Sequence, residues 1–391
     1  MSIKTYDWIV VGGGITGTAL AYELARQDFR VLLLDKDATL QNATRYSYGG
    51  LAYWSGTSQL TRQLCQEGIA CHRHLSEELE ADTQFRELDL LLTIDTEDDP
   101  EATARSYAQF AISPQLLSVE EACEREPLLN RGAIAGAIRF PHGHIHPAKT
   151  TQAYSNAFRR AGGEIQVAEV VKLQPRGDHR IESVKTTDGT YYAANTVVCA
   201  GGFSRSLLQA TGVDLPLYFT HAELIETPPL DLKLRTLLMP ADMQRVALES
   251  QASTPELDPL WDEPGHKLAP PILDPGATQF CDAHLCFGQL SRVLTNPYAS
   301  IDAAASEAAI RKGVGKVLPA LEDVPGTWHR CLIAFSRNSL PVVGALSNVA
   351  GIYVFSGFTN TLLFAPPLAK RFASWAAGQG DEVIAQLSPT G

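Results

Sequence analysis

The apolar positions at the start of the chain change from a continuous run to a helical period and back again. Continuous apolar runs at residues 8–11 and 31–34 predict two buried strands. Between them, Leu20, Ala21 and Leu24 recur at the spacing of one helix face. Buried strands joined by a helix are typical of a parallel sheet with both faces covered, so the chain is predicted to open with a βαβ unit.

A glycine-rich turn joins the first strand to this helix. Gly12, Gly14 and Gly17 have the spacing G-x-G-x-x-G. The first glycine permits a tight turn, the second lets a pyrophosphate approach the backbone N–H groups, and the third lets the helix pack closely on the sheet. Asp35, at the end of the second strand, is placed to accept hydrogen bonds from ribose hydroxyls. These features predict a dinucleotide site, but they leave NAD and FAD open.

The rest of the chain alternates between helical and extended patterns. Ser118 and Glu121 fit a capping box, and Asp188 with Gly189 fits a hairpin turn. The proline-rich stretch at 255–271 indicates a surface loop or lid. Helices are predicted at 58–79, 118–126, 148–161, from 204, at 303–317 and from about 360 to 377, and extended segments at 88–94, 138–147, 164–173, 181–193, 196–199, 218–226, 245–250, 279–290 and 351–355.

The order of these elements predicts an α/β fold with two domains. A FAD/NAD(P)-binding Rossmann-like domain is assembled from residues 1–85, 147–214 and 325–391. A substrate domain of the α+β kind, with a mixed or antiparallel β-sheet, is inserted into it as residues 86–146 and 215–324. The length of 391 residues suits two domains, because single cores stop growing at roughly 250 to 300 residues. The split arrangement disfavours a simple NAD dehydrogenase, whose binding domain is usually contiguous.

Composition and charge narrow the classes of partner. The net charge of −12 and the lack of a Lys/Arg run argue against nucleic acid. No apolar window approaches the roughly 18 residues of a membrane span, and the first strand follows Met1 too closely for a signal peptide, so we expect a cytoplasmic protein. The seven cysteines form no CxxC pair and no zinc spacing. Because no carboxylate or cysteine cluster accompanies His142, His144 and His146, no metal is predicted.

Four blocks of the sequence resemble the FAD-dependent oxidoreductases grouped around D-amino acid oxidase, glycine oxidase and sarcosine oxidase. The blocks are 12–35, 44–50, 195–202 and 340–366, in the order and spacing of that family. The resemblance implies FAD as the cofactor. It implies that FAD is contacted by Gly12, Gly14, Ile15, Thr16, Gly17, Asp35, Lys36, Thr44, Arg45, Ser47, Gly49, Gly50, Val170, Ala200, Gly201, Gly357, Thr359, Asn360, Thr361 and Leu362.

The resemblance also implies a reaction. A small amine or amino acid is oxidised at its C–N bond by hydride transfer to flavin N5, and water then hydrolyses the imine. Relatives grip a substrate carboxylate with an arginine at a position where this chain has Ile333. Four other arginines lie in blocks near the expected site: Arg45, Arg292, Arg330 and Arg337. Arg337 is taken as the candidate for the substrate contact, and Tyr218 and His146 are the other two catalytic candidates.

Two cysteines mark further departures. Cys286 stands where sarcosine oxidase-like enzymes place a lysine for oxygen activation, so O2 and another electron acceptor both stay open. Cys331 resembles the cysteine that sarcosine oxidase joins to its flavin. We expect non-covalent FAD, with a covalent link at Cys331 as the alternative.

Two alternative functions remain. A flavin-dependent 2-hydroxy acid dehydrogenase on the same fold would need a base to take the alcohol proton, such as His146 or His221. A flavin-binding subunit with little turnover of its own would need neither the missing arginine nor the missing lysine. The sequence leaves the substrate and the oligomeric state open.

Overall fold

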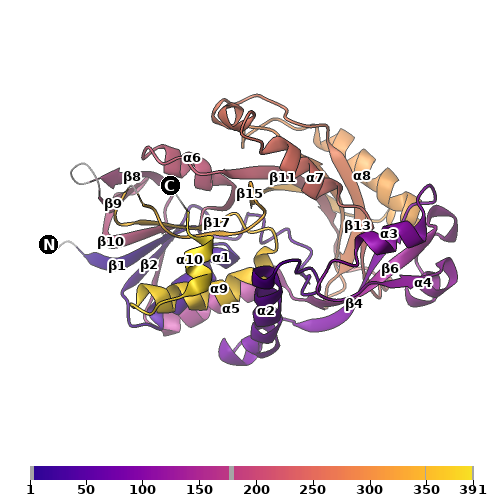
Figure 1. Cartoon of the computed structure of the whole chain (residues 1–391), viewed down its shortest axis with the longest axis horizontal. Helices are drawn as coiled ribbons and strands as arrows, with labels where there is room; N and C mark the ends of the chain where they lie inside the picture. Colours follow the sequence, from indigo (N-terminus) through magenta and orange to yellow (C-terminus); the bar gives the residue numbers. More distant parts are fainter. Residues whose placement is uncertain (1–3, 176–179, 348, 390–391) are drawn as a thin grey trace.

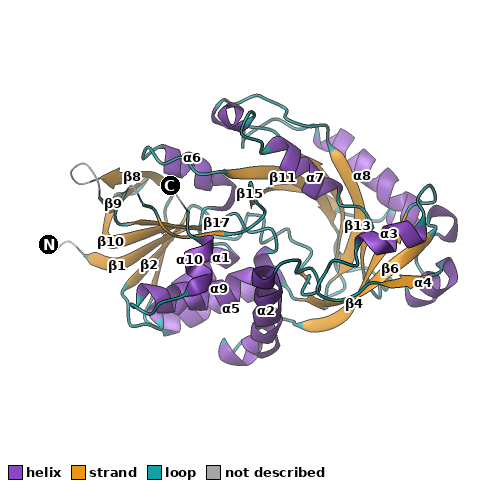
Figure 2. Cartoon of the chain, in the orientation of Figure 1, coloured by secondary structure: helices purple, strands orange, loops and turns teal. Residues whose placement is uncertain are grey.

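Two β-sheets organise the chain, which a computed structural model describes over residues 4–175, 180–347 and 349–389. The first sheet lies at the left of Figure 1 and the second at the right. Strand β11 (Leu217–Glu226) belongs to the second sheet and runs along the top of the view, paired with β15 (Thr327–Ser336). Figure 2 shows helices gathered below the first sheet and α8 (Ala303–Val317) on the outer side of the second.

The first sheet is mainly parallel and begins with the predicted βαβ unit. Its strand order is β16-β17-β10-β1-β2-β7, and β9 pairs with both β10 and β8. Strands β16 and β9 run antiparallel to their neighbours in an otherwise parallel path. The strands are β1 (Thr5–Val11), β2 (Val31–Asp35), β7 (Glu164–Val167), β8 (Val170–Pro175), β9 (Ile181–Thr186), β10 (Thr190–Val198), β16 (Val342–Ala345) and β17 (Ile352–Ser356).

Both faces of this sheet are covered, which explains the continuous apolar runs of its strands. Val10 and Leu33 pack against helices α1, α2, α5 and α9 on one face. Ile9 and Leu32 pack against the β8–β9 hairpin and α6 on the other. The helices are α1 (Ile15–Ala25), α2 (Gln59–Glu78), α5 (Pro147–Arg160), α6 (Ser204–Gln209), α9 (Thr361–Ala376) and α10 (Glu382–Leu387).

The second sheet has the order β15-β11-β14-β13-β12-β4-β6-β3, with β5 also paired to β6. Neighbours are antiparallel except β12 and β4, which are parallel. Helix α8 packs on β13 and β14 through Ile310 and Val314. The remaining elements are β3 (Gly50–Leu51), β4 (Arg86–Ile94), β5 (Gln115–Leu117), β6 (Gly136–His144), β12 (Leu237–Pro240), β13 (Ile272–Gln279), β14 (Leu285–Arg292), α3 (Pro100–Ser106), α4 (Val119–Arg125) and α7 (Gln244–Ala252).

The predicted α/β fold class is confirmed, and several element predictions agree closely with the structure. The capping box of Ser118 and Glu121 forms at α4, and α8 has its predicted bounds. Residues 245–250 were predicted as a strand, which is wrong: they belong to helix α7, which buries Leu248 and Ala252 on one face. Residues 279–290, predicted as one extended segment, span the turn between strands β13 and β14. The predicted segments 181–193 and 196–199 are joined, because residues 190–198 form one strand that continues from the hairpin into the parallel sheet.

The division into two discontinuous domains stays a prediction, and the sheets differ from it at one strand. Strand β15 follows the predicted boundary at 325 but pairs along its whole length with β11 of the second sheet. It then leads into β16 of the first sheet. Among the described helices, none combines the length and the apolar character that crossing a membrane requires.

Glu23 is a buried carboxyl on α1. Its residue is 5% exposed, its Oε2 accepts a 3.4 Å hydrogen bond from Arg26, and its Oε1 has no hydrogen-bond partner among the described residues. Burial raises the pKa of Glu23 from 4.5 to about 7. Between pH 4.5 and 7 the folded state therefore keeps a proton that the unfolded state has released. The contribution of this proton to the free energy of unfolding is lost as the pH rises through 7.

We predict that Glu23→Gln increases the free energy of unfolding at pH 8.5 by about 1–3 kcal/mol, because it removes the cost of ionising a buried carboxyl. The gain should vanish below pH 4.5, where both side chains are neutral. Urea unfolding at pH 4.5 and 8.5 measures the difference. The exposed Glu77→Gln serves as the control, and an equal gain at both pH values would contradict the prediction.

Candidate functional site

A cavity of about 580 Å³ lies at the carboxyl ends of the parallel strands of the first sheet. Ends of β1, β2, β10 and β17 meet there, which is where open α/β sheets bind ligands. The lining includes the predicted glycine turn, Asp35 and the residues that follow β10. Four separate parts of the chain thus converge on one cavity.

The geometry of the glycine turn fits a dinucleotide. Gly12 has φ +112°, and a Cβ there would lie 2.4 Å from the Cys199 carbonyl oxygen. A Cβ on Gly17 would lie 1.8 Å from the Gly12 carbonyl oxygen, so α1 approaches β1 more closely than any other residue allows. Gly14 has no side chain to cap the start of α1, and no acidic residue stands in its first turn; the Ile15 N–H donates a 3.2 Å hydrogen bond to Thr44 Oγ1. The helix start therefore offers N–H groups and its positive dipole end to an anion.

Asp35 lies beside this turn. Its Oδ2 accepts a hydrogen bond from the Gly13 N–H, and its Oδ1 accepts one of 2.8 Å from the Asp37 N–H. Lys36, next to it, forms a 2.7 Å ion pair with Asp37. Asp35 is thus held by the backbone at the rim of the cavity, in the place expected for a ribose contact.

A second cavity of about 520 Å³ adjoins the first. Thr44, Cys331 and Ile333 line both cavities, so the two lie on either side of these residues. The second cavity is enclosed by segment 43–55, by the start of α9, by β11 and β15, and by residues of α7 and β13. It therefore lies between the cofactor turn and the second sheet.

The structure brings most of the predicted cofactor residues to these two cavities. Within the described ranges, Gly17, Arg45 and Gly49 line neither: Gly17 packs on Gly12, and Arg45 forms an ion pair with Glu226. The predicted residues that line one or both are Gly12, Gly14, Ile15, Thr16, Asp35, Lys36, Thr44, Ser47, Gly50, Val170, Ala200, Gly201, Gly357, Thr359, Asn360, Thr361 and Leu362.

The three predicted catalytic residues lie elsewhere. Arg337 donates hydrogen bonds to the Tyr218 hydroxyl (2.7 Å) and the Ser253 carbonyl (2.8 Å), and Tyr218 donates one to Asp258. His146 caps α5, where its Nδ1 accepts from the Lys149 N–H. In the described part of the chain, none of these three lines either cavity, because each is held in a local polar contact that turns it away.

Three charged residues that the sequence analysis did not select line the second cavity instead: Asp242, Arg245 and Asp274. Arg245 lies on α7, and Asp274 on β13 is 5% exposed. Burial raises the pKa of Asp274 from 3.8 to about 6, and the nearby positive charge of Arg245 opposes that rise. The sequence analysis did not select Arg245 because its segment was predicted as a strand. It did not select Asp274 because this residue precedes a β-bulge, which interrupts the alternation of apolar and polar residues that marks a strand.

The histidines near the cavities are poor bases. His142 lines the second cavity, its Nδ1 accepts a 3.1 Å hydrogen bond from Trp54 Nε1, and burial lowers its pKa to about 3. His221 lines the first cavity, and burial lowers its pKa to about 4. Neither ring has the proton affinity that efficient base catalysis near neutral pH requires.

A comparison with known families now identifies the fold and the cofactor. The family model described as FAD dependent oxidoreductase (DAO) matches residues 7–375. The chain belongs to this family. Its members depend on FAD, and the first cavity provides the turn, the helix start and the carboxylate that such a cofactor needs.

Individual relatives agree with this assignment at low identity. The 4-methylaminobutanoate oxidase (formaldehyde-forming) of Paenarthrobacter nicotinovorans is 24% identical over 94% of this chain and 43% of its own length. The peroxisomal sarcosine oxidase of Homo sapiens is 30% identical over 54% of each chain. The chain thus spans about half the length of these relatives, or less. The crystal structure of glycine oxidase from Geobacillus kaustophilus has the same fold, with a TM-score of 0.79 over 99% of this chain and 98% of the other at 22% identity.

Cys331 faces the junction of the two cavities in this FAD-dependent oxidoreductase. Its residue is 9% exposed, and burial raises the pKa of its thiol from 9.0 to about 12. A thiol with such a pKa is protonated at neutral pH and is a weak nucleophile. The environment therefore disfavours a covalent bond to the flavin.

We predict that the flavin leaves the polypeptide when the holoenzyme is denatured in acid, because Cys331 stays a free thiol. Absorbance of the precipitate and supernatant, with intact-mass measurement, checks this. Cys331→Ala should give the same partition. A flavin adduct in the wild-type mass that is lost in Cys331→Ala would show the covalent alternative.

Proposed function

We propose that this FAD-dependent oxidoreductase oxidises the C–N bond of a small amine that carries a carboxylate, such as an amino acid. The observation that supports this most directly is the pair of Arg245 and Asp274 in the lining of the second cavity. A guanidinium suits a carboxylate, and a carboxylate suits an ammonium group. FAD, when bound, supplies the acceptor for the hydride equivalent.

In this proposal Arg245 holds the substrate carboxylate. Its Nε lies 3.9 Å from Glu249 Oε1, too far for a strong hydrogen bond, and its side chain is 29% exposed. Burial raises the pKa values of Glu249, Asp242 and Asp274, which weakens the neutralisation of Arg245 by these carboxyls. Its positive charge also acts on the thiol of Cys331, so the guanidinium lies within electrostatic reach of the cavity junction. Arg245 would thus take over the role of the arginine that relatives carry at the position of Ile333.

Asp274 has the complementary role. Oxidation of an amine requires the neutral amine, so a group must accept the proton of the ammonium form. A carboxyl with a pKa of about 6 is ionised at neutral pH and has a higher proton affinity than an exposed aspartate. The low pKa of His142 leaves Asp274 as the better-matched base in this cavity.

The names of the relatives agree with this substrate class. Sarcosine, glycine and 4-methylaminobutanoate each carry an amine and a carboxylate on a small carbon skeleton, and these compounds name three of the similar enzymes. The relatives differ from one another in the spacing of the two groups. Which spacing this enzyme accepts, and whether O2 takes the electrons, is therefore decided by experiment.

The test is anaerobic reduction of the enzyme-bound flavin by three panels of compounds. Amino acids and N-methyl amino acids should bleach the visible absorption band of the oxidised flavin, whereas matched amines without a carboxylate should bleach it far more slowly. Bleaching by 2-hydroxy acids alone would replace the proposal with the dehydrogenase alternative. Bleaching by no compound would favour a flavin-binding subunit. Oxygen uptake by the reduced enzyme then separates an oxidase from a dehydrogenase.

We predict that Arg245→Gln raises KM for the carboxylate-bearing substrate about 10- to 100-fold, because a charge-assisted hydrogen bond is lost. Reduction by a matched amine without a carboxylate should change little. Arg337→Gln is the control, because Arg337 is held by Tyr218 and Ser253 outside the cavities. A rise in KM for Arg337→Gln but not for Arg245→Gln would restore Arg337 as the anchor.

We predict that kcat/KM falls below about pH 6 in the wild type, where Asp274 becomes protonated and no longer accepts the ammonium proton. Asp274→Asn should lose this acidic limb and show about 100-fold lower kcat/KM at pH 7, with recovery at high pH where the free amine is present. Stopped-flow reduction across pH 5–10 measures the profile. The exposed Asp98→Asn should keep the wild-type profile, and an unchanged acidic limb in Asp274→Asn would contradict the assignment.

A further inference from the structure

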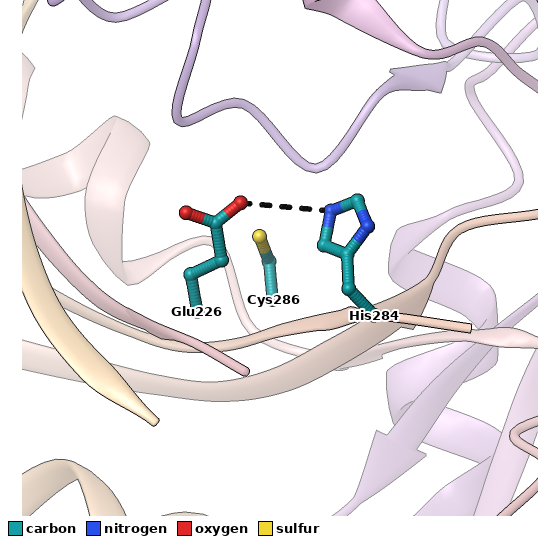
Figure 3. Close-up of side chains that lie close together, drawn as sticks. All are labelled: Glu226, His284 and Cys286. Carbon is teal, nitrogen blue, oxygen red and sulfur yellow. Dashed lines mark ion pairs between the residues drawn. The ribbon is translucent and has the colours of Figure 1, made fainter. Parts of the chain in front are cut away.

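A carboxylate, an imidazole and a thiol converge where β11 ends and β14 begins. Glu226 is the last residue of β11 and pairs with Cys286 of β14, and His284 directly precedes that strand. Their ligand atoms all lie within 4.8 Å of one another. Figure 3 shows the Cys286 sulfur between the Glu226 carboxylate and the His284 ring. None of these residues is among the described residues that line the two cavities, so the cluster is separate from the proposed substrate site.

The cluster is largely shielded from water. Cys286 is 1% exposed, and the side chains of His284 and Glu226 are 11% and 15% exposed. The His284 ring stacks on Phe280, with centroids 4.3 Å apart and planes 5° apart. This stacking fixes the direction in which the ring nitrogens point.

The His284 ring is also oriented by a second carboxylate. Its Nδ1 donates a hydrogen bond to Asp282 Oδ1, so that Nε2 of the neutral ring carries the lone pair. Nε2 points to Glu226 Oε1 at 3.6 Å, where two acceptors would face each other with no hydrogen between them. A carboxylate that holds one ring nitrogen while the other faces a ligand cluster is the usual support of a metal-binding histidine.

We propose that Glu226, His284 and Cys286 form a Zn²⁺ site, with water or His329 as the fourth ligand. His329 Nε2 lies 3.5 Å from Glu226 Oε2, the carboxylate oxygen that also accepts a hydrogen bond from Arg45. Mixed thiolate, imidazole and carboxylate ligands suit zinc in a tetrahedral geometry. Such ligands lie roughly 3.5 Å apart around the ion, so side-chain shifts of about 1 Å complete the site.

The surrounding charges balance a dication. A Cys286 thiolate and the Glu226 carboxylate neutralise Zn²⁺, while Arg45 and Asp282 offset each other. Arg45 donates to Glu226 at 2.8 Å, and a carboxylate has enough lone pairs to accept this bond and ligate a metal. Arg45 belongs to the segment that lines the cofactor cavities on either side of it. Zinc would therefore brace the second sheet against that segment.

The experiment measures zinc in untagged, FAD-loaded full-length protein. After chelation, the protein is mixed with ZnSO4, desalted and analysed for metal by mass spectrometry. We expect one zinc per chain in the wild type. Loading with Co²⁺ should give intense tetrahedral d–d bands at wavelengths beyond the flavin absorption.

Variants assign the ligands. His284→Ala and Cys286→Ser should each lose the bound metal. Asp282→Asn should weaken zinc affinity about 10- to 100-fold, because the histidine loses its supporting carboxylate. The exposed Cys281→Ser, in the same turn, should keep one zinc and provides the matched control. Flavin content and melting temperature show whether each variant is folded, and His284→Gln replaces any variant that is not.

Two outcomes would overturn the proposal: no zinc retained by the wild type, or equal zinc in the wild type, His284→Ala and Cys286→Ser. Either would leave His284 in polar contact with Asp282 and Glu226 alone, with no metal between them. The measurement requires no substrate, so its result is independent of the proposed oxidation.

Discussion

The close approach of α1 to β1 at two glycines is the contact on which the cofactor cavity depends. Because Gly17 lies against the Gly12 carbonyl, the helix start is carried to the edge of the sheet, where it lines the first cavity and its positive dipole end faces that space. The parallel strands on either side end at the same edge. Any side chain at these positions would push the helix away and close the space that a pyrophosphate requires.

The second sheet completes the site by covering this edge. Strands β11 and β15 pair over ten residues and carry Cys331 and Ile333 over the junction of the two cavities. Helix α7 and β13 then add Arg245 and Asp274 from the far side of the same sheet. The first sheet thus forms the cavity that fits the cofactor, whereas the second sheet contributes charged side chains to the adjoining cavity.

Burial gives each of these charges its character. Asp274 and Glu23 are both carboxyls whose pKa rises on removal from water, but one faces a cavity and the other a helical core. The same physical effect gives a proton acceptor in the proposed function of Asp274, whereas at Glu23 it only costs stability. At Glu226, by contrast, Arg45 compensates the buried carboxylate directly.

The sequence by itself determined the fold class and the dinucleotide turn, and most of the cofactor residues predicted from it line the two cavities. These follow from local signals, because glycine spacing, apolar period and capping residues act within a few positions of the chain. Tertiary structure alone decided which polar side chains come into contact. In it Arg337 is hydrogen-bonded to Tyr218, residues 245–250 form a helix that lines the cavity, and Glu226 pairs with Cys286. Pairing register and burial join residues far apart in sequence, and no local pattern encodes those contacts.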